Sequence, residues 1–553
     1  MQNKKKILFV TESHKLASGF GTYSKEVLSR LHKMGKYEIA EFACYASSDS
    51  FENPDWLIYG NAPMANETEY ADQHSKNPTL QWGIGRFDHA VLDFKPDIVA
   101  TYRDPWMDSF IQSSILLPFF HWVWMPTVDS EPQKNEWLYW FNQCDGLLAY
   151  SEYGVRTLEE QTHGRLKVSG CASPAIDPVE FNIIPNKKEH KKSFGLDPES
   201  FIVGTVMRNQ KRKMFPELMR SFKDFLAKAP SDIAKKSYLY LHTSYPEKMG
   251  WDITSLIHEY GLGSRILVTY VCRHCKNYFP SHYRDAITLC QHCNHLAATM
   301  PGVQNGIPHS ELNNIYNLMD LYVQYAICEG FGMPQVEAAA CGTPIAATNY
   351  SAMEDVVKFC NGYPIEPKLA REMETNADRS GPNNECLSNI ILSCATQTEQ
   401  QAKKRRLETR KGCINRYTWD IAAKSWADYF DSVTKTKPLE GKWTAPPLMR
   451  DIPDQIPNGM SNPHFCEWIC LEVLQNQEKA YGYDMLNMLR NLNFGAVIGG
   501  DLSTYNQERA FNESKGLAEH RLFFDRLRTG AISATQSFVV EAHRRFGGLM
   551  FYL

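Results

Sequence analysis

The segment that most constrains the fold is residues 329–344, EGFGMPQVEAAACGTP, which places two carboxylates eight residues apart across the junction between a loop and a helix. The run before it, at residues 321–326, reads as a buried strand, and TPIAATN after Gly342 reads as the next strand. A strand, a loop, a helix and a second strand in this order predict a parallel sheet with a crossover helix. A plain tight turn followed by an Ala-rich helix is the alternative for this segment alone.

The loop has the features of an anion-binding helix start. Gly330 and Gly332 allow close backbone approach, and Pro334 suits a first helical position, so unpaired N–H groups point outward. Such a terminus attracts an anion. The carboxylates of Glu329 and Glu337, one on each side, accept hydrogen bonds from hydroxyl groups. These residues predict a ligand that carries both phosphate and polyol groups, a description that fits a nucleotide sugar.

Strands and helices alternate along most of the chain. In the first half, KILFVTES, YEIAEFACY, PDIVATYR, LPFFHWVWM and GLLAYS read as strands, and GTYSKEVLSRLHKMG reads as a helix. The same pattern restarts near residue 201 with FIVGTVMRN, SYLYLHTS and RILVTYV. The alternation predicts an α/β protein with two doubly wound, Rossmann-like domains. A ligand is then expected in the cleft between them, at the carboxyl ends of the strands.

At 553 residues the chain is too long for a single core. The first Rossmann-like domain is predicted to span residues 1–190 and the second residues 200–415, with a Lys-rich polar linker near residues 183–199. A proline-rich linker is predicted at residues 434–459. Residues 460–553 are expected to form a mainly helical extension of unknown role.

Residues 329–344 resemble the donor-binding signature E-G-F-G-x-P-x-x-E-A-x-A-x-G-x-P of glycosyltransferase family four, a group of retaining enzymes with the GT-B fold. The resemblance covers roughly residues 5–432 and implies a nucleotide diphosphate sugar, UDP-linked, as donor. It implies that Glu337 accepts hydrogen bonds from the ribose hydroxyls and that Glu329 holds sugar hydroxyls. The amides that would meet the phosphate and the sugar are those of Phe331, Gly332 and Met333.

Cationic side chains follow the first strand of the second domain. Arg208 and Lys213 have an R-x4-K spacing that resembles the pair that neutralises the donor diphosphate in this family, with Lys211 and Arg212 as rivals of Lys213. Two positive charges there stabilise the departing nucleotide. The chain contains no Asp-x-Asp pair, which favours catalysis without a metal ion. The leaving phosphate oxygen is expected to take the proton of the acceptor, so no side-chain base is required.

The acceptor side carries weaker signals. Gly19 and Gly21, in a Gly-Phe-Gly after the first strand, resemble a loop that faces the donor phosphates and the acceptor, with a plain turn as the alternative. Asp129, in MPTVDSE, resembles an element that borders the acceptor pocket and is taken as a catalytic candidate. A helix over residues 416–433 resembles the GT-B helix that crosses back onto the first domain, because Trp419, Ala423, Trp426 and Phe430 share one face.

Four cysteines form a C-x2-C…C-x2-C pattern with 14 residues between the pairs: Cys272, Cys275, Cys290 and Cys293. Each pair supplies two thiolates to a tetrahedral ion, so the spacing predicts a zinc ribbon inserted at residues 271–298. Four ligands leave no open position, and the zinc is therefore expected to be structural. A redox role is one alternative, and replacement of one cysteine by a nearby histidine is another, the candidates being His274, His292 and His295.

Charge and composition limit the compartment and the partners. A net charge of −4 gives no general attraction to nucleic acid or anionic lipid. The chain begins MQNKKKILFV, without the long apolar region of a signal peptide, and the apolar patch at residues 115–126 contains His121 and two prolines. The fifteen cysteines lie mostly in apolar segments, as expected for buried thiols. We therefore expect a cytoplasmic protein without a membrane span.

The acceptor stays open between a glycan or lipid-linked saccharide and a hydroxymethylated base in DNA. The zinc-ribbon insertion resembles glycosyltransferases encoded by tailed phages, in which case the protein would act in the host cytoplasm. The ribbon, the basic run at residues 403–411 and the region after residue 460 could then contact a duplex. Two other functions remain as alternatives: a sugar-nucleotide epimerase of the same fold, and a nucleic-acid-binding zinc-ribbon protein with an inactive sugar site. The sequence does not predict the oligomeric state.

Overall fold

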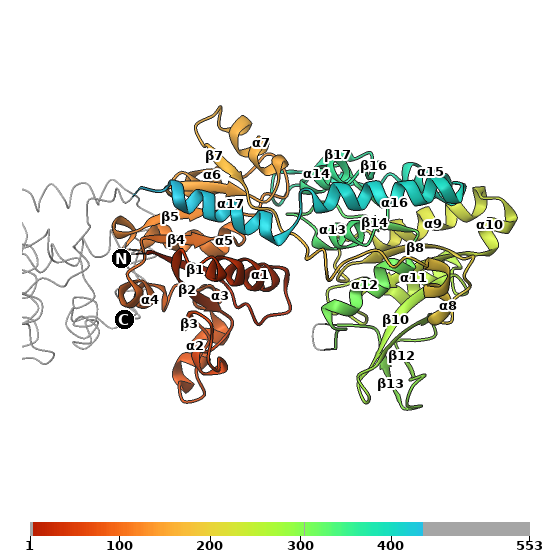
Figure 1. The fold of residues 1–553 in the computed structure, drawn as a ribbon, viewed down its shortest axis with the longest axis horizontal. Helices are drawn as coiled ribbons and strands as arrows, with labels where there is room; N and C mark the ends of the chain where they lie inside the picture. Colours follow the sequence, from red (N-terminus) through yellow and green to blue (C-terminus); the bar gives the residue numbers. More distant parts are fainter. Residues whose placement is uncertain (1–3, 115, 303–304, 435–553) are drawn as a thin grey trace, which may run out of the picture.

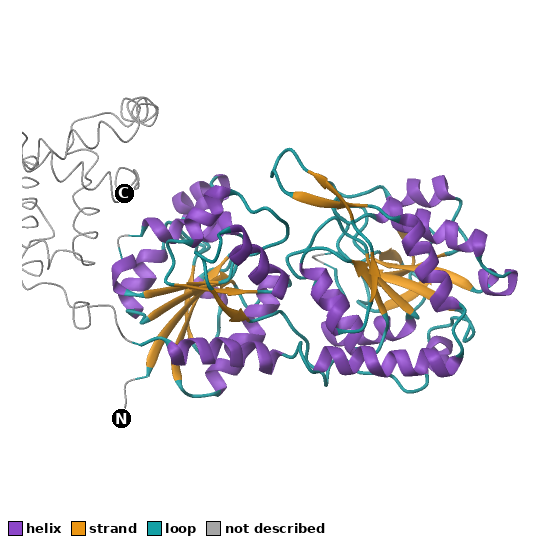
Figure 2. Ribbon diagram, turned by 90° about the horizontal axis from the view of Figure 1, so that it is seen from above, coloured by secondary structure: helices purple, strands orange, loops and turns teal. Residues whose placement is uncertain are grey.

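The computed structural model describes residues 4–434, except residues 115, 303 and 304. The predicted extension at residues 460–553 and all but the first residue of the predicted linker at 434–459 lie outside the described residues. The described part consists of two α/β domains, one on the left and one on the right of Figure 1. In each, helices cover both faces of a central sheet (Figure 2). Within the described residues no helix has both the length and the apolar composition needed to cross a bilayer.

The first domain is built on a seven-stranded parallel sheet with the order β3-β2-β1-β4-β5-β6-β7. Its strands are β1 (Lys5–Glu12), β2 (Tyr37–Cys44), β3 (Leu57–Gly60), β4 (Ile98–Thr101), β5 (His121–Trp124), β6 (Gly146–Ala149) and β7 (Val168–Cys171). Its helices are α1 (Gly19–Lys33), α2 (Thr68–Lys76), α3 (Pro78–Trp82), α4 (Phe87–Phe94), α5 (Pro105–Asp108), α6 (Asn135–Phe141) and α7 (Glu152–Gln161). The central strand β1 buries Ile7, Phe9 and Val10 completely, as expected for a strand covered on both faces.

The second domain has a sheet whose parallel part runs in the order β10-β9-β8-β14-β15-β16. These strands are β8 (Phe201–Val206), β9 (Ser237–His242), β10 (Ile266–Cys272), β14 (Leu321–Gln324), β15 (Ile345–Thr348) and β16 (Tyr363–Ile365). Its helices are α8 (Lys187–Ser193), α9 (Phe215–Lys228), α10 (Ser231–Lys235), α11 (Ile253–Tyr260), α12 (His309–Leu318), α13 (Met333–Ala340), α14 (Ala352–Phe359), α15 (Asn384–Ala395) and α16 (Glu399–Ile414). A separate hairpin of β17 (Lys368–Arg371) and β18 (Asp378–Gly381) follows β16.

Three antiparallel strands join this second sheet at β10. They are β11 (Tyr278–His282), β12 (Ile287–Leu289) and β13 (Leu296–Thr299), and they form the predicted ribbon region. Both β11 and β13 pair directly with β10. The insertion is therefore part of the main sheet and covers the edge that β10 would otherwise expose.

Both parallel sheets share one strand order, and this order positions the site. In each sheet the chain moves outward from the first strand on one side and then returns to pair on its other side, so the direction reverses between β1 and β4 and between β8 and β14. Ligands bind in the crevice that opens at the carboxyl ends of the strands at such a reversal. The fold thus provides two crevices, one in each domain.

The predicted polar linker is partly a packed helix. Lys191 of α8 is 3% exposed, and its Nζ lies 2.7 Å from Oδ2 of Asp320, while Lys187 Nζ lies 3.0 Å from the other oxygen. Burial of the carboxyl raises the pKa of Asp320, but the two ammonium groups outweigh this effect and lower that pKa to about 2. A carboxylate 129 residues away along the chain thus compensates the burial of a lysine that the sequence pattern places on a solvated face.

Helix α17 (Trp419–Ser432) returns the chain to the first domain, where it lies across the left-hand domain in Figure 1. Trp426 is fully buried, its ring centroid lies 5.4 Å from that of Phe9, and its Nε1 donates a hydrogen bond of 2.7 Å to the hydroxyl of Tyr23. Lys5 Nζ donates to the carbonyl of Val433 at 2.6 Å. The apolar face of α17 therefore completes the core of the first domain.

Replacing Trp426 by alanine should lower the free energy of unfolding by about 3–5 kcal/mol, because it removes a fully buried indole and its hydrogen bond. Urea unfolding followed by circular dichroism measures the change. Ile421→Ala on the same helix is the matched control, since that side chain is 40% exposed and the change should cost less than about 0.5 kcal/mol. Equal effects of the two substitutions would contradict this packing.

Candidate active site

A cavity of about 440 Å³ lies between the domains, where the two crevices meet. Its lining comes from segments at the carboxyl ends of β1, β4, β5, β6 and β7 in the first domain and of β8 and β14 in the second. The predicted site residues that line it are Gly19, Arg208, Lys213, Glu329, Phe331, Gly332 and Met333. Gly21, Asp129 and Glu337 lie outside this lining.

Both carboxylate oxygens of Glu329 have partners in the cavity. Its side chain is buried, and Oε1 accepts a 2.7 Å hydrogen bond from Gln324 Nε2 and contacts the ammonium of Lys213. Oε2 accepts from Arg212 Nη1 at 2.7 Å, and the Glu329 amide donates to Ser351 Oγ at 3.0 Å. Burial and the nearby Arg212 lower the pKa of Lys213 well below its usual range, whereas contact with Glu329 favours the ammonium. The carboxylate is therefore held in one orientation.

The structure shows which of the cationic residues Lys211, Arg212 and Lys213 line the cavity. Lys213 lines the cavity, whereas the Nζ of Lys211 lies 4.1 Å from the centre of the Trp251 ring and is not part of the lining. Arg208 also lines the cavity, but its guanidinium pairs with Glu247 at 2.8 Å. Arg212, considered from the sequence only as a rival, lines the cavity beside Lys213. The cationic side of the site thus contains three residues after β8.

The loop before α13 requires glycine at two positions. Gly332 caps the helix with φ of +85°, a left-handed conformation that favours glycine. A Cβ on Gly330 would lie 2.4 Å from Cγ2 of Thr127, so this loop approaches the first domain too closely for a side chain. Pro334 occupies the first turn of α13. The helix start therefore faces the cavity with Gly332 and Met333 in its lining, which suits an anion.

Glu337 lies one helical turn further on, under a histidine. Its Oε2 accepts a 2.6 Å hydrogen bond from the hydroxyl of Tyr316, and its Oε1 lies 3.4 Å from Nε2 of His309. His309 Nδ1 lies 3.3 Å from Oε2 of Glu180, and the Phe181 ring packs against the imidazole edge to face. Burial opposes protonation, yet the two carboxylates raise the pKa of His309 to about 9. The sequence did not indicate this histidine.

Two predicted residues make structural contacts in the described structure. Asp129 Oδ1 accepts from Arg379 Nη1 of β18 at 3.2 Å, and Oδ2 accepts from Cys328 Sγ at 3.4 Å, so Asp129 joins the two domains. Gly21 lies inside α1, and a Cβ there would lie 2.3 Å from the carbonyl oxygen of Leu16. Their predicted contacts with substrate remain predictions.

Asp104 is a cavity residue that the sequence interpretation missed. It follows β4, lines the first-domain side of the cavity and is half-buried. Burial raises the pKa of this carboxyl to about 6, although the hydroxyl of Thr127 acts in the opposite direction. The sequence signal was its place directly after the predicted strand PDIVATYR, but only the structure shows that this strand pairs with β1 at the reversal of strand order.

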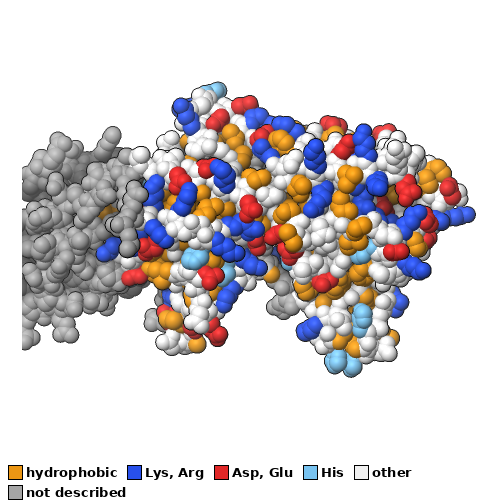
Figure 3. Space-filling model, viewed as in Figure 1, with side chains coloured by type: hydrophobic (Ala, Val, Ile, Leu, Met, Phe, Trp, Pro, Cys, Tyr) orange, Lys and Arg blue, Asp and Glu red, His pale blue; other side chains and the backbone are white. Residues whose placement is uncertain are grey.

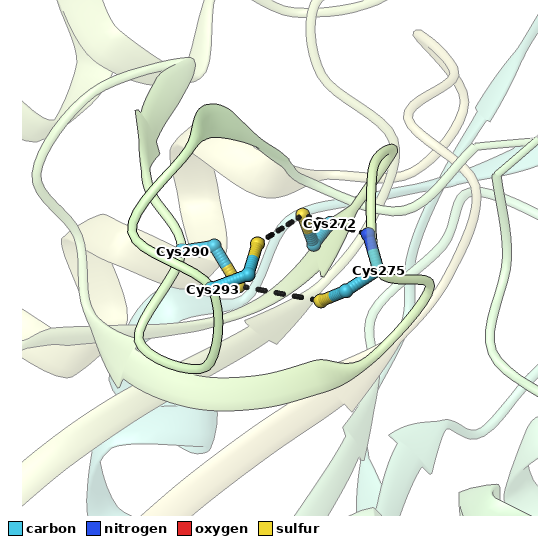
Figure 4. A group of neighbouring side chains, drawn as sticks. All are labelled: Cys272, Cys275, Cys290 and Cys293. Atoms are coloured by element: carbon cyan, nitrogen blue, oxygen red, sulfur yellow. Dashed lines mark hydrogen bonds between the residues drawn. The ribbon is translucent and has the colours of Figure 1, made fainter.

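The four cysteines predicted to bind zinc converge from two turns (Figure 4). Cys272 Sγ lies 3.7 Å from Cys293 Sγ, and Cys275 Sγ lies 3.7 Å from Cys290 Sγ. Sulfurs bound tetrahedrally to zinc at 2.3 Å are about 3.8 Å apart, so the separations fit the ion. The amides of His274 and His292 donate to Cys272 and Cys290 Sγ at 3.4 and 3.3 Å. The cluster is compatible with a zinc ribbon.

The neighbouring histidines lie outside this four-cysteine set. The rings of His274 and His295 stack with centroids 3.8 Å apart, and both side chains are exposed. Histidine side chains gather at the lower tip of the second domain in Figure 3, where Figure 1 places β12 and β13. Among the described residues, the one cysteine that could share a metal ion with these two histidines is Cys293, which already belongs to the cluster. Four thiolates therefore remain the better ligand set for the described ribbon.

Two Rossmann-like domains with a ligand cleft between them define the GT-B class of fold, and comparisons with known proteins agree. Sucrose-phosphate synthase from Thermosynechococcus elongatus has a TM-score of 0.56 at 14% identity, covering 77% of this chain and 98% of that one. HepE from Anabaena, in complex with UDP and glucose, has a TM-score of 0.52 at 16% identity, covering 78% and 100%. A glycosyltransferase from Rickettsia africae has a TM-score of 0.52 at 15% identity, covering 78% and 98%.

The chain also carries a recognisable family domain. Residues 294–379, which include α13 and both predicted glutamates, match the family described as "Glycosyl transferases group 1". No curated protein sequence matches the chain. The predicted α/β fold with two Rossmann-like domains is thus confirmed, and the segment that predicted it lies within the matched domain.

Removing a cysteine should release the metal from the ribbon. We expect one zinc per chain in the purified protein, with Cys290→Ser lowering zinc content and thermal stability together, because folding of such a site is coupled to binding of its ion. Elemental analysis and a thermal melt measure the two quantities. Cys386→Ser, at a free cysteine outside the cluster, should change neither. Absence of zinc from the wild-type protein would refute the assignment.

His309 should make stability depend on pH. Its pKa of about 9 is above its ordinary value of 6.5, so its ion pairs contribute fully below pH 6.5 and are lost as the pH rises through 9. The melting temperature of the wild type should therefore fall more between pH 6.5 and 9.5 than that of His309→Gln. His258→Gln, at an exposed histidine of α11, is the control and should follow the wild type. Parallel curves for wild type and His309→Gln would contradict the raised pKa.

Proposed function

We propose that this protein is a retaining glycosyltransferase that transfers a sugar from a UDP-linked donor to a hydroxyl acceptor without a catalytic metal ion. The observation that carries the proposal is the buried Glu329, held by Arg212 and Lys213 at the start of α13 inside the cleft. The matched group 1 glycosyltransferase domain supports it. The UDP and glucose in the HepE complex support a UDP-sugar donor for the same fold.

The cleft binds the two kinds of group on the donor differently: backbone amides bind its diphosphate, and carboxylates bind its hydroxyls. The diphosphate lies at the start of α13, where the amides of Gly332 and Met333 and the helix dipole favour negative charge. Glu329 accepts hydrogen bonds from hydroxyls of the sugar. The ribose reaches Glu337, where its hydroxyls replace or join the contact with His309.

The cations after β8 stabilise the departing nucleotide. When the bond between the anomeric carbon and the phosphate oxygen breaks, negative charge develops on the diphosphate. Arg212 and Lys213 are already fixed at the cavity by Glu329, and Arg208 reaches the diphosphate by exchanging Glu247 for phosphate oxygens. The acceptor oxygen forms the new bond on the same face, and its proton passes to the leaving phosphate oxygen. No side-chain base takes part.

We also propose that the cysteine cluster binds a structural zinc ion. The four cysteines would hold the ion with no open position, at the far edge of the second sheet beyond β10. When bound, zinc supplies cross-linking of the two turns and no step of sugar transfer. EDTA under mild conditions should accordingly leave the transfer rate unchanged.

Glu329→Gln and Glu337→Ala should each reduce sugar transfer roughly 10-fold to 100-fold, because a charged hydrogen bond contributes about 1.5–3 kcal/mol. Release of radiolabelled UDP from a panel of UDP-sugars measures turnover, and circular dichroism checks folding. Glu366→Gln, at an exposed glutamate outside the cavity, is the matched control. Near-normal turnover by both site variants would exclude this site.

A further inference from the structure

We infer that the hairpin of β17 and β18 is a strap that holds the two halves of the cavity in register, and that Arg379 of β18 is a positioning residue for sugar transfer. The strap comprises residues 368–381. The inference rests on the proposed function, because transfer requires a donor held by the second domain to meet groups of the first domain. The sequence motifs did not indicate Arg379.

The hairpin is separate from the main sheet of the second domain. Strands β17 and β18 form a two-stranded sheet of their own, and all four residues of β17 are exposed. Ser380 of β18, by contrast, is 1% exposed. The hairpin therefore contacts the rest of the protein mainly through β18, and those contacts lead to the cavity.

In the first domain, β18 binds the segment that follows β5. The amide of Asp378 donates to the carbonyl of Glu131 at 2.7 Å. The Tyr350 hydroxyl donates to the carbonyl of Asp378 at 2.6 Å and accepts from the amide of Glu131 at 3.1 Å. These three hydrogen bonds form a closed ring. Beside it, Arg379 Nη1 lies 3.2 Å from Oδ1 of Asp129, so both the backbone and a side chain of β18 bind the first domain.

In the second domain, β18 binds the segment that follows β14. The amide of Ser380 donates to the carbonyl of Ile327 at 3.0 Å, and Arg379 Nη1 donates to Cys328 Sγ at 3.0 Å. The Arg379 Nε also pairs with Oε2 of Glu372 within the hairpin at 3.1 Å, and the side chain is only 16% exposed. One guanidinium therefore contacts both domains and is held in place by several partners at once.

Both segments that β18 binds continue into the cavity. Thr127 lines the cavity at the start of the first-domain segment, and Glu329 and Gly330 line it directly after the second-domain segment. A Cβ on Gly330 would lie 2.4 Å from Cγ2 of Thr127, so the two segments meet there without room for a side chain. The strap thus binds each segment a few residues away from its cavity-lining part and sets the position of one half of the cavity relative to the other.

Loss of the strap should affect turnover more than binding of the nucleotide. In the proposed function the diphosphate and the sugar are bound by residues of the second domain, at the start of α13 and after β8. Transfer also needs the first domain, and a misplacement of about 1 Å can lower a rate roughly 100-fold. A positioning role therefore predicts a fall in kcat with little change in the affinity for UDP.

The first experiment measures turnover and binding in parallel. Arg379→Gln should lower kcat for UDP release from the best donor of the UDP-sugar panel by about 10-fold or more, while the Kd of UDP from calorimetry stays within about 3-fold of wild type. Arg379→Lys keeps a cation within reach of Asp129 and should recover kcat to within about 3-fold of wild type. Arg371→Gln is the matched control, because this 48% exposed arginine of β17 pairs within the hairpin with Asp378, and it should match the wild type. A normal kcat for Arg379→Gln, or equal losses of kcat and UDP affinity, would overturn the inference.

The second measurement does not depend on turnover. Hydrogen exchange of the full chain without substrate, followed by mass spectrometry, should be roughly 3-fold or more faster in Arg379→Gln than in wild type for peptides covering residues 127–133 and 327–333. Peptides of β1 and β8 should exchange as in wild type.

Tyr350→Phe is the second variant, and it also provides the test should Arg379→Gln not fold. It removes the hydroxyl from the ring of three hydrogen bonds and should speed exchange in the peptide covering residues 127–133. Unchanged exchange in that peptide for both variants would overturn the inference. Absence of UDP release by the wild type, together with the expected exchange, would instead contradict the proposed function and leave the strap in place.

Discussion

The cleft depends on one buried carboxylate. An unpaired carboxylate in the position of Glu329 would cost several kcal/mol to desolvate, and it is compensated by donors from Gln324, Arg212 and Lys213. These partners come from the segment after β8 and from the last residue of β14. Backbone hydrogen bonds join the segments after β8 and β14, from Met214 to Tyr325 at 3.0 Å and from Ile327 to Arg212 at 3.0 Å. The charges that face the cavity are therefore fixed before any ligand arrives, which is the condition for electrostatic stabilisation of a transition state.

The two domains are joined by contacts of different character. Helix α17 packs its apolar face into the first core through Trp426. The other contacts between the domains are mixed: Asp129 pairs with Arg379, Asp355 of α14 accepts from the amide of Tyr153 at 3.3 Å, and the rings of Tyr153 and Tyr350 lie 5.7 Å apart. Apolar and polar contacts therefore both join the domains.

The sequence predicted those elements whose formation depends on residues that are close together in the chain. The runs that became β1, β8 and β14 are apolar and buried on both faces, and the cysteine spacing defined the cluster without knowledge of the fold. Strands β3 and β7 are short and partly exposed, so they carry no comparable signal. Burial of Lys191 depends on Asp320, which is remote in sequence. Asp104 becomes a site residue only because β4 pairs with β1, a fact of topology that no motif encodes. The glutamate motif predicted its own region but not the histidine that covers Glu337.

The ribbon has a consequence for the second domain as a whole. Because β11 pairs with β10, the backbone amides and carbonyls along the side of β10 away from β9 are satisfied by a segment that lies between the two pairs of the cysteine cluster. Oxidation of those thiols to disulfides of the wrong pairing would pull the turns out of register and uncover a long apolar strand. An uncovered strand of this kind pairs readily with another chain. The cover on this edge of the second sheet thus depends on four sulfur atoms that lie outside the cavity lining.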